Sequence, residues 1–240
     1  RAHDRPVPPG PLFGVGMTMS CSQTADSATG ANKVVSSRRY THIAIALHWI
    51  IAVSIIAMLA MGVWMVDAIK QPDTQALAFQ TYQFHKSLGL TIIILSLARL
   101  GWRLLNPPPP LPAHMPRFQK ATSHATHMLF YALMIGMPLT GWAMVSASPL
   151  GLPTIVFGWF EWPHIAWLEA VEDKAAVAER FKLAHMYAGY LMIGLVVLHI
   201  AAALKHQFVD RDNLIARMSP LAQPPKTASN APTTTDRRET

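Results

Sequence analysis

The chain has 240 residues, of which 51% are hydrophobic and 14% are charged, and it carries a formal net charge of +7. Because soluble domains are typically about 25% charged, this composition excludes a disordered chain and most soluble enzymes. The single cysteine, Cys21, excludes an internal disulfide and any all-cysteine metal or iron–sulfur site within one chain. The positive charge is typical of the basic cytoplasmic segments of a membrane protein, so we expect no nucleic-acid partner.

The hydrophobic residues fall in four blocks that are long enough to cross a membrane. About 20 apolar residues in a helix span a hydrocarbon core of about 30 Å, and lipid forces each segment to satisfy its own backbone polar groups. The sequence therefore predicts an all-α integral membrane protein, a bundle of four transmembrane helices within a domain of residues 40–218. The predicted spans are residues 43–66, 85–105, 127–145 and 183–204.

The connections between the spans differ in charge, which predicts the orientation of the chain. The outer loop, residues 146–182, carries five acidic residues and three basic ones. The segments expected on the other side are basic and contain Lys33, Arg38, Arg39, Arg117, Lys120, Lys205, Arg211 and Arg217. The positive-inside rule therefore predicts that both termini lie in the cytoplasm.

The two ends of the chain and the outer loop have compositions of their own. Residues 1–39 are predicted to form a flexible cytoplasmic extension, because this segment is rich in Pro, Gly, Ser and Thr. Residues 219–240, rich in Pro, Thr, Ala and Lys, are predicted to form a disordered cytoplasmic tail. The chain does not begin with Met, so we expect either that Met17 or Met19 is the natural start or that a leader is missing. The aromatic stretch within residues 157–162 is expected to lie at the membrane surface, followed by a short amphipathic helix.

Four of the eleven histidines lie in the spans at depths that match in pairs, and ionisable residues there are costly and mark functional sites. His48 and His199 each lie six residues from the cytoplasmic end of their spans, and His85 and His185 lie near the outer ends of theirs. His185 and His199 are 14 residues apart, which places both on one helix face about 21 Å apart. The four histidines therefore form two pairs, one near each membrane surface.

Two neutral imidazoles that face each other across a bundle are the axial ligands that a six-coordinate haem b needs. Glycines at matching depth would let a flat macrocycle approach the backbone, and basic residues near each surface would bind its propionates. The candidates are Gly62, Gly89 and Gly189, with Arg99 and Arg103 inside and Lys86 and Lys182 outside. The alternatives are hydrogen-bonded core histidines, or a zinc or copper site, which needs three or four ligands where each depth offers two.

Several short motifs occur together in this chain. They are Ile45–Trp49, His85–Gly89, Ala98–Leu100, Ala125–His127 with Tyr131, Pro138–Trp142, and Lys182–His185 with His199 and His206. In their order and intervals they resemble the bacterial cytochrome b561 family, over residues 40–220. The resemblance implies a four-helix bundle in the bacterial inner membrane that binds two b haems. His48 and His199 would ligate the iron of the inner haem, and His85 and His185 that of the outer haem.

The resemblance also implies a function in electron transport. Some members of the family oxidise superoxide at the outer haem and pass the electron inward to ubiquinone. We therefore expect a superoxide:ubiquinone oxidoreductase, with lipid, quinone, and either superoxide or a periplasmic redox protein as partners. His206 shares a helix face with His199 and is the candidate for the quinone site. Lys86 and Lys182 would attract an anion to the outer haem.

Two other functions fit the same pattern of spans. One alternative is the cytochrome b subunit of a larger respiratory complex, hydrogenase-like or formate dehydrogenase-like, which carries electrons without substrate chemistry of its own. A transporter or a structural bundle is the other, but the sequence shows neither repeated halves nor charge at the midplane. His124 and His127, at the entrance of the third span, either line the inner haem or quinone pocket or are ordinary interfacial residues.

Overall fold

The computed structural model describes residues 39–113, 115–212 and 214–221. Its four long helices are α2 (His42–Ala68), α3 (Gln75–Leu105), α4 (Arg117–Ser146) and α6 (Lys174–Phe208). All four are long and apolar enough to cross a membrane, which confirms the expected set of four membrane-spanning helices. The predicted N-terminal extension and C-terminal tail lie outside the described residues, apart from residues 39 and 219–221.

Each helix contains the apolar run predicted for it and continues into polar sequence. α3 begins at Gln75 rather than at residue 85, because neither glycine nor proline interrupts the intervening residues. α4 begins directly after Pro116 and runs without a break through Pro138. The side chain of Thr41 caps α2, and that of Asp173 caps α6, by accepting a hydrogen bond from a backbone N–H of the first turn.

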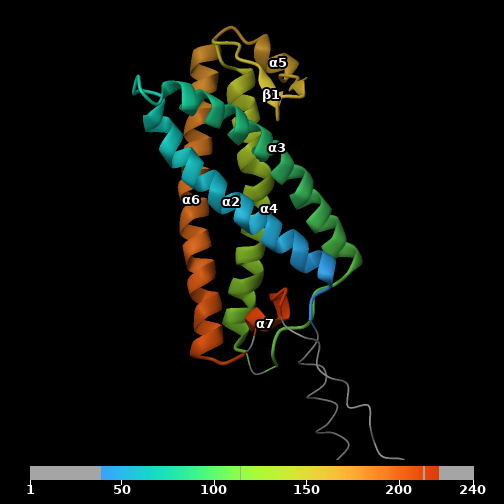
Figure 1. Ribbon diagram of the computed structural model, residues 1–240. Helices are drawn as coiled ribbons and strands as arrows, with labels where there is room; N and C mark the ends of the chain where they lie inside the picture. Colours follow the sequence, from blue (N-terminus) through green and yellow to red (C-terminus); the bar gives the residue numbers. More distant parts are fainter. Residues whose placement is uncertain (1–38, 114, 213, 222–240) are drawn as a thin grey trace, which may run out of the picture. The chain divides into compact units, whose positions relative to one another are not determined.

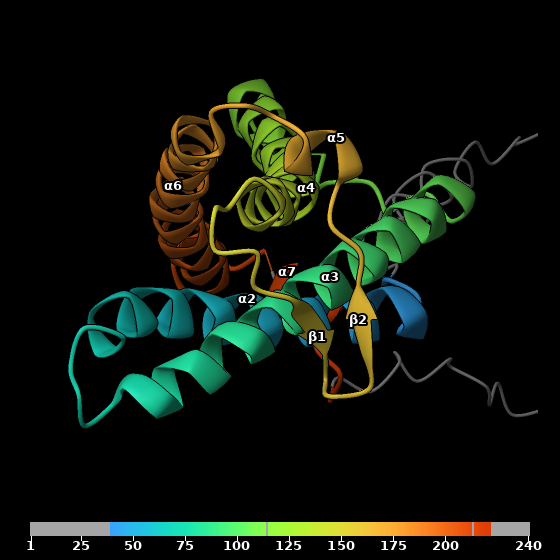
Figure 2. The ribbon, with the colours of Figure 1, turned by 90° about the horizontal axis from the view of Figure 1, so that it is seen from above.

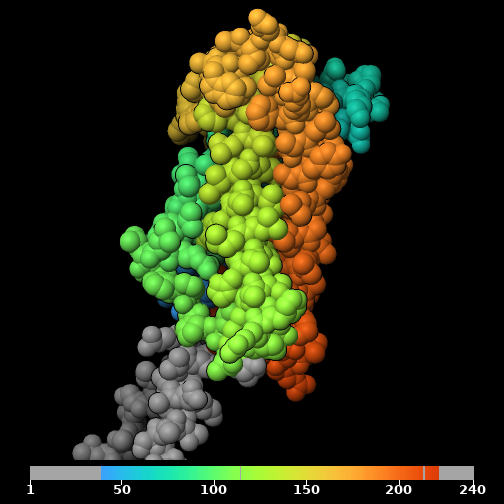
Figure 3. Space-filling view, turned by 180° about the vertical axis from the view of Figure 1, so that it is seen from behind, coloured from blue at the N-terminus to red at the C-terminus, as the bar shows by residue number. Residues whose placement is uncertain are grey.

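The helices alternate in direction, which gives the bundle two ends. The start of α2, the end of α6 and the proline-rich connection between α3 and α4 lie at one end, which we call the proline end. The connection between α2 and α3 and the loop between α4 and α6 lie at the other, the hairpin end (Figure 1). α2 packs on α3, and α4 packs on α6 along their length, with α3 against α4 (Figures 2 and 3).

The apolar side chains of the helices divide into a thin core and a broad outer surface. The core joins all four helices through Ile51, Ile55, Met58, Ile92, Tyr131, Met134 and Met192. On the outer side, large apolar side chains are open: Val53 is 64% exposed, Ile94 is 65% exposed and Val197 is 62% exposed. Such a surface is an aggregation hazard in water but matches lipid tails, which supports burial of these helices in a membrane.

The loop between α4 and α6 forms a small β-hairpin, which the sequence analysis did not predict. β1 (Thr154–Val156) pairs antiparallel with β2 (Phe160–Trp162), and the short helix α5 (Ala166–Glu169) follows. The turn between the strands has positive φ at Phe157 (47°) and Gly158 (81°). Tight hairpin turns need positive φ, but phenylalanine rarely adopts it, so little in the residue types indicates this turn.

Side chains of α3 hold the hairpin. Gln83 donates from Nε2 to the Pro153 carbonyl (3.1 Å) and accepts at Oε1 from the Ile155 N–H (3.2 Å). The buried hydroxyl of Ser87 accepts from the Phe157 N–H and lies within hydrogen-bonding distance of the Ile155 carbonyl, both at 3.1 Å. The hairpin therefore depends on contacts between residues about 70 positions apart in the chain.

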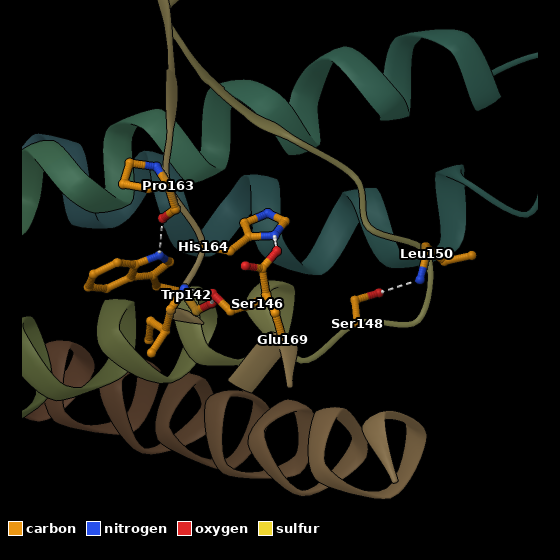
Figure 4. Close-up of polar contacts among 8 residues, drawn as sticks. Trp142, Ser146, Ser148, Leu150, Pro163, His164 and Glu169 are labelled. Atoms are coloured by element: carbon orange, nitrogen blue, oxygen red, sulfur yellow. Dashed lines mark hydrogen bonds and ion pairs between the residues drawn. The ribbon is translucent and has the colours of Figure 1, made fainter. Parts of the chain in front are cut away.

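α4 holds the other side of the same loop. The Trp142 indole N–H donates to the Pro163 carbonyl (3.0 Å), as Figure 4 shows. The Ser146 hydroxyl accepts from the Ile165 N–H (3.0 Å), just ahead of α5. Because α3 and α4 both bind it, the loop is fastened across the hairpin end of the bundle.

At the proline end, the segment after α6 returns to the start of α2. It contains the short helix α7 (Leu214–Met218). The Trp49 indole N–H donates to the Met218 carbonyl (2.8 Å), and the buried Arg217 donates from Nη1 to the Pro110 carbonyl (2.9 Å). These bonds join three segments that lie far apart in the sequence.

Replacing Ser87 with Ala should loosen the hairpin, because the Phe157 N–H then loses its partner at a cost of about 1–3 kcal/mol. Thr91→Ala is the matched control, since the Thr91 hydroxyl donates only to a carbonyl of its own helix. Limited proteolysis of the detergent-solubilised protein should cut residues 150–165 faster in the Ser87 variant. Equal cleavage rates in the two variants would show that Ser87 does not hold the hairpin.

Candidate functional site

Two histidines from different helices meet near the proline end of the bundle. The imidazole centroids of His48 on α2 and His199 on α6 are 6.4 Å apart, with the rings inclined at 63°. α2 packs mainly on α3, and α6 mainly on α4, so these side chains reach from one helix pair to the other. The structure thus brings together the two residues that were matched by depth in the sequence.

The second pair lies near the hairpin end and has the same form. The ring centroids of His85 on α3 and His185 on α6 are 6.2 Å apart, and the rings are inclined at 68°. His185 Nδ1 lies 2.9 Å from the Met137 carbonyl, so this nitrogen carries the proton and donates it. The arrangement leaves Nε2 of His185 with a free lone pair, as a metal ligand requires.

The spacing of both pairs fits two imidazoles bound to one metal. Two metal–nitrogen bonds of about 2 Å and two ring radii of about 1 Å separate axial imidazole centroids by about 6 Å. His85 Nδ1 is buried and has no hydrogen-bond partner among the described residues. A buried polar atom without a partner is costly in a protein that spans lipid, so His85 differs from an ordinary hydrogen-bonded core histidine.

One glycine on α4 and one on α2 lie beside the histidines of the pair near the hairpin end. A Cβ at Gly141 would stand 3.1 Å from Cε1 and 3.2 Å from Nδ1 of His185, which is too close unless the ring moves. A Cβ at Gly62 would stand 3.6 Å from Cε1 of His85, an ordinary contact. Gly62 was predicted at this depth, whereas Gly141 entered the sequence analysis only as part of a motif.

The other two predicted glycines have different surroundings. A Cβ at Gly89 would stand 3.6 Å from the Met58 side chain and 3.9 Å from that of Pro138, so this position packs against α2 and α4. A Cβ at Gly189 would have no neighbour within 4 Å, so this part of α6 is open. Their proposed role in making room for a macrocycle stays a prediction.

His127 of α4 lies beside the inner pair. Its ring centroid is 5.7 Å from that of His199, and the ring of Phe130 lies 5.3 Å from His199 on the same side. His127 Nδ1 donates to the Ser123 carbonyl one turn earlier (2.8 Å). His124 makes the equivalent bond to its own helix but is exposed, so of the two only His127 contacts the pair.

The basic residues predicted near the inner pair come from the last turns of α3. Arg99 donates from Nη1 to the Ala44 carbonyl of α2 (3.0 Å) and lies close enough to His48 and His199 to act on them electrostatically. Arg103 follows one helical turn later, nearer the proline end. From this position the two arginines could bind a negatively charged group that lies beside His48 and His199.

The two outer lysines are engaged by other groups. The Lys86 ammonium donates to the Pro153 carbonyl (2.7 Å) and so helps to hold the hairpin on α3. The Lys182 ammonium pairs with Glu179 (2.7 Å), and both side chains are more than half exposed. Their role in attracting an anion stays a prediction, and the partner of Lys182 reduces the positive charge there.

His206 lies at the end of α6 with two carboxylates. Its Nδ1 is 3.0 Å from Oδ2 of Asp210 and 2.9 Å from Oδ2 of Asp212. Helical spacing predicts His206 on the face of His199, but neither carboxylate could be predicted in this way, because both lie beyond the end of the helix. The three side chains have the types of ligand atom that bind a metal ion, but Asp210 already pairs with Lys205.

Comparisons with known proteins agree with this arrangement. Residues 39–220 match the family described as Prokaryotic cytochrome b561. Cytochrome b561 homolog 2 of Escherichia coli (strain K12) is 33% identical over 181 residues, which cover 75% of this chain and 90% of that protein. The Probable superoxide oxidase CybB of Yersinia pestis is 26% identical over 188 residues, which cover 76% of this chain and 97% of that protein. This chain therefore belongs to the prokaryotic cytochrome b561 family of membrane cytochromes, which bind b-type haem.

Proposed function

We propose that this protein is a membrane oxidoreductase that carries electrons through two b-type haems, from a periplasmic donor to the quinone pool. The observation that carries the proposal is the pair of imidazoles at each end of α6, with centroids 6.4 Å and 6.2 Å apart. His48 and His199 would hold the inner haem, and His85 and His185 the outer one. Each haem, when bound, would accept and release one electron.

The chain's own residues orient the ligands and exclude water. The Met137 carbonyl fixes the proton of His185 on Nδ1, so that Nε2 is the nitrogen left for the iron. Between the two histidine pairs lie apolar side chains such as Met58, Ile92 and Met192, which keep water out of the midplane. A dry, low-dielectric interior suits an electron carrier, because it lowers the reorganisation that accompanies each change of charge.

We propose that the proline end faces the cytoplasm in the bacterial inner membrane, with both termini there. The basic residues of the connections gather at this end, as the positive-inside rule requires. In this orientation Arg99 and Arg103 lie at the cytoplasmic side, where they can pair with haem propionates. Quinone would be reduced at the same side.

The proposed donor is superoxide, on the strength of a relative named as a probable superoxide oxidase. Two superoxide ions would each lose one electron to the outer haem and leave as dioxygen. Ubiquinone would take those two electrons and two protons and leave as ubiquinol. Lys86 and Lys182, on the periplasmic side, would favour the approach of the anion.

The reduced-minus-oxidised visible spectrum of the purified protein should show two low-spin b haems per chain. His48→Ala and His85→Ala should each remove one haem, and so about half of the absorbance, because each removes one of the two histidines that would hold that haem. His124→Ala is the control, since this exposed residue bonds only within its own helix. If folded protein that was produced with an adequate supply of haem contains none, the four histidines are core residues and not haem ligands.

Gly141→Ala should weaken the outer haem alone. The added methyl would meet the His185 ring at 3.1 Å and displace it from the Met137 carbonyl. Loss of such a supporting bond weakens metal binding by about 10-fold or more. Gly136→Ala on the same helix is the matched control, because nothing lies within 4 Å of that position. Haem retention during dilution should fall in the first variant only, and equal retention would contradict the placement of His185.

Charge reversal at Lys86 and Lys182 should slow the reduction of the haem by superoxide about 10-fold and flatten its dependence on salt. Lys182→Glu alone separates charge from structure, because the Lys182 ammonium pairs with Glu179 of its own helix, whereas that of Lys86 holds the hairpin. Lys70→Glu is the control, a hairpin-end lysine that pairs with Asp67. Stopped-flow rates that do not change would place the entry of electrons elsewhere.

A further inference from the structure

The end of α6 turns back sharply, so that two carboxylates meet the ring of His206. After Phe208 the backbone N–H of Asp210 donates to the Lys205 carbonyl (3.1 Å), and that of Asp212 to the His206 carbonyl (3.0 Å). Arg211 between them has a φ of 54°, which a residue with a side chain rarely adopts. This turn directs both carboxylates to one atom, Nδ1 of His206.

The geometry fixes which ring nitrogen carries the shared proton. Carboxylates only accept hydrogen bonds, and both Asp210 and Asp212 approach Nδ1, at 3.0 Å and 2.9 Å. Nδ1 of His206 therefore donates, and Nε2 is the nitrogen that the carboxylates leave available. An imidazole held in this way can take up and release a proton at Nε2 without changing its orientation.

The two carboxylates are not equivalent. The side chain of Asp210 is 26% exposed and also pairs with Lys205, whereas the side chain of Asp212 is only 5% exposed. A buried carboxylate is costly unless it is paired, and the ring of His206 is one of the groups that pair with Asp212. A simple helix cap would not need a second, buried carboxylate on the same imidazole nitrogen.

We infer that Asp212 is a positioning residue for proton delivery to quinone, and this inference rests on the proposed reduction of quinone at the proline end. Quinone takes two electrons from the haems and two protons to become quinol. The imidazolium of His206 releases one of these protons from Nε2 to a quinone oxygen, and an O–H bond forms as the N–H bond breaks. The imidazole then regains a proton from water, and water supplies the second proton of the quinol.

The test uses haem-loaded protein that has been reduced with dithionite and freed of excess reductant, so that no superoxide is involved. Its oxidation is followed after mixing with a short-chain ubiquinone, and separately with ferricyanide, which takes an electron but no proton. Asp212→Asn should lower the saturating rate with ubiquinone about 10-fold, with the half-saturating concentration unchanged. Haem content and the ferricyanide rate should stay at the wild-type level.

Further variants sharpen the comparison. Asp67→Asn, which changes an exposed carboxylate at the hairpin end, is the control and should leave the rate unchanged. Asp210→Asn should slow the reaction less than Asp212→Asn does, because Asp212 still holds Nδ1. Asp212→Glu keeps the carboxylate and should recover most of the rate. His206→Ala should be at least as slow as Asp212→Asn, and adding Asp212→Asn to it should slow it no further, because both residues act through one proton transfer.

Each outcome decides between the two ideas. A wild-type protein that reduces ferricyanide but not ubiquinone overturns the proposed quinone reduction itself. A wild-type protein that reduces ubiquinone, beside an Asp212→Asn variant with an unchanged saturating rate, overturns only the role of Asp212. Loss of haem or of the ferricyanide rate in Asp212→Asn, or an equal loss in Asp210→Asn, would show that the cluster only ends the helix, and would overturn that role too.

Discussion

The arrangement depends on one constraint: a single helix, α6, presents an imidazole at each of two depths. Lipid surrounds the bundle, so both rings must face its interior, where each meets a histidine from another helix. His48 on α2 and His85 on α3 meet α6 at opposite ends of the bundle. Each lies near the first part of its helix, and the two helices are antiparallel neighbours joined by a short connection. α4 contributes no histidine to either pair, but it supplies the surface that holds His185 in place.

This constraint explains why the sequence alone predicted so much. A membrane sets where each helix enters and leaves, and the rise per residue is fixed, so counting residues from the ends of the spans is a measurement of depth. His199 and His48 could be matched in this way without knowledge of how the helices pack. The count could not show that His127 lies beside them, because the rotation of α4 about its axis depends on packing.

Outside the helices the sequence was a weaker guide, for physical reasons that differ between the two ends. The hairpin depends on Gln83 and Ser87, which bind residues about 70 positions away, and on a phenylalanine with positive φ. Neither leaves a local pattern. Lys86 shows the consequence: it was predicted as a charge beside His85, and it also anchors the hairpin through Pro153. Electrostatics and the structure of the outer loop are therefore coupled at this residue.

At the proline end the chain after α6 is held on both sides of the turn that carries Asp212. Before the turn, backbone carbonyls of α6 accept hydrogen bonds from the N–H groups of Asp210 and Asp212. After it, Trp49 binds the Met218 carbonyl, and Trp49 is the neighbour of His48 in α2. Because the turn is held on both sides, the Asp212 carboxylate keeps one geometry toward His206. A residue that positions a proton on one ring nitrogen requires such a fixed geometry. The same bonds link the position of this turn to the helix that carries His48, so the proposed transfers of electrons and protons would share one supporting framework.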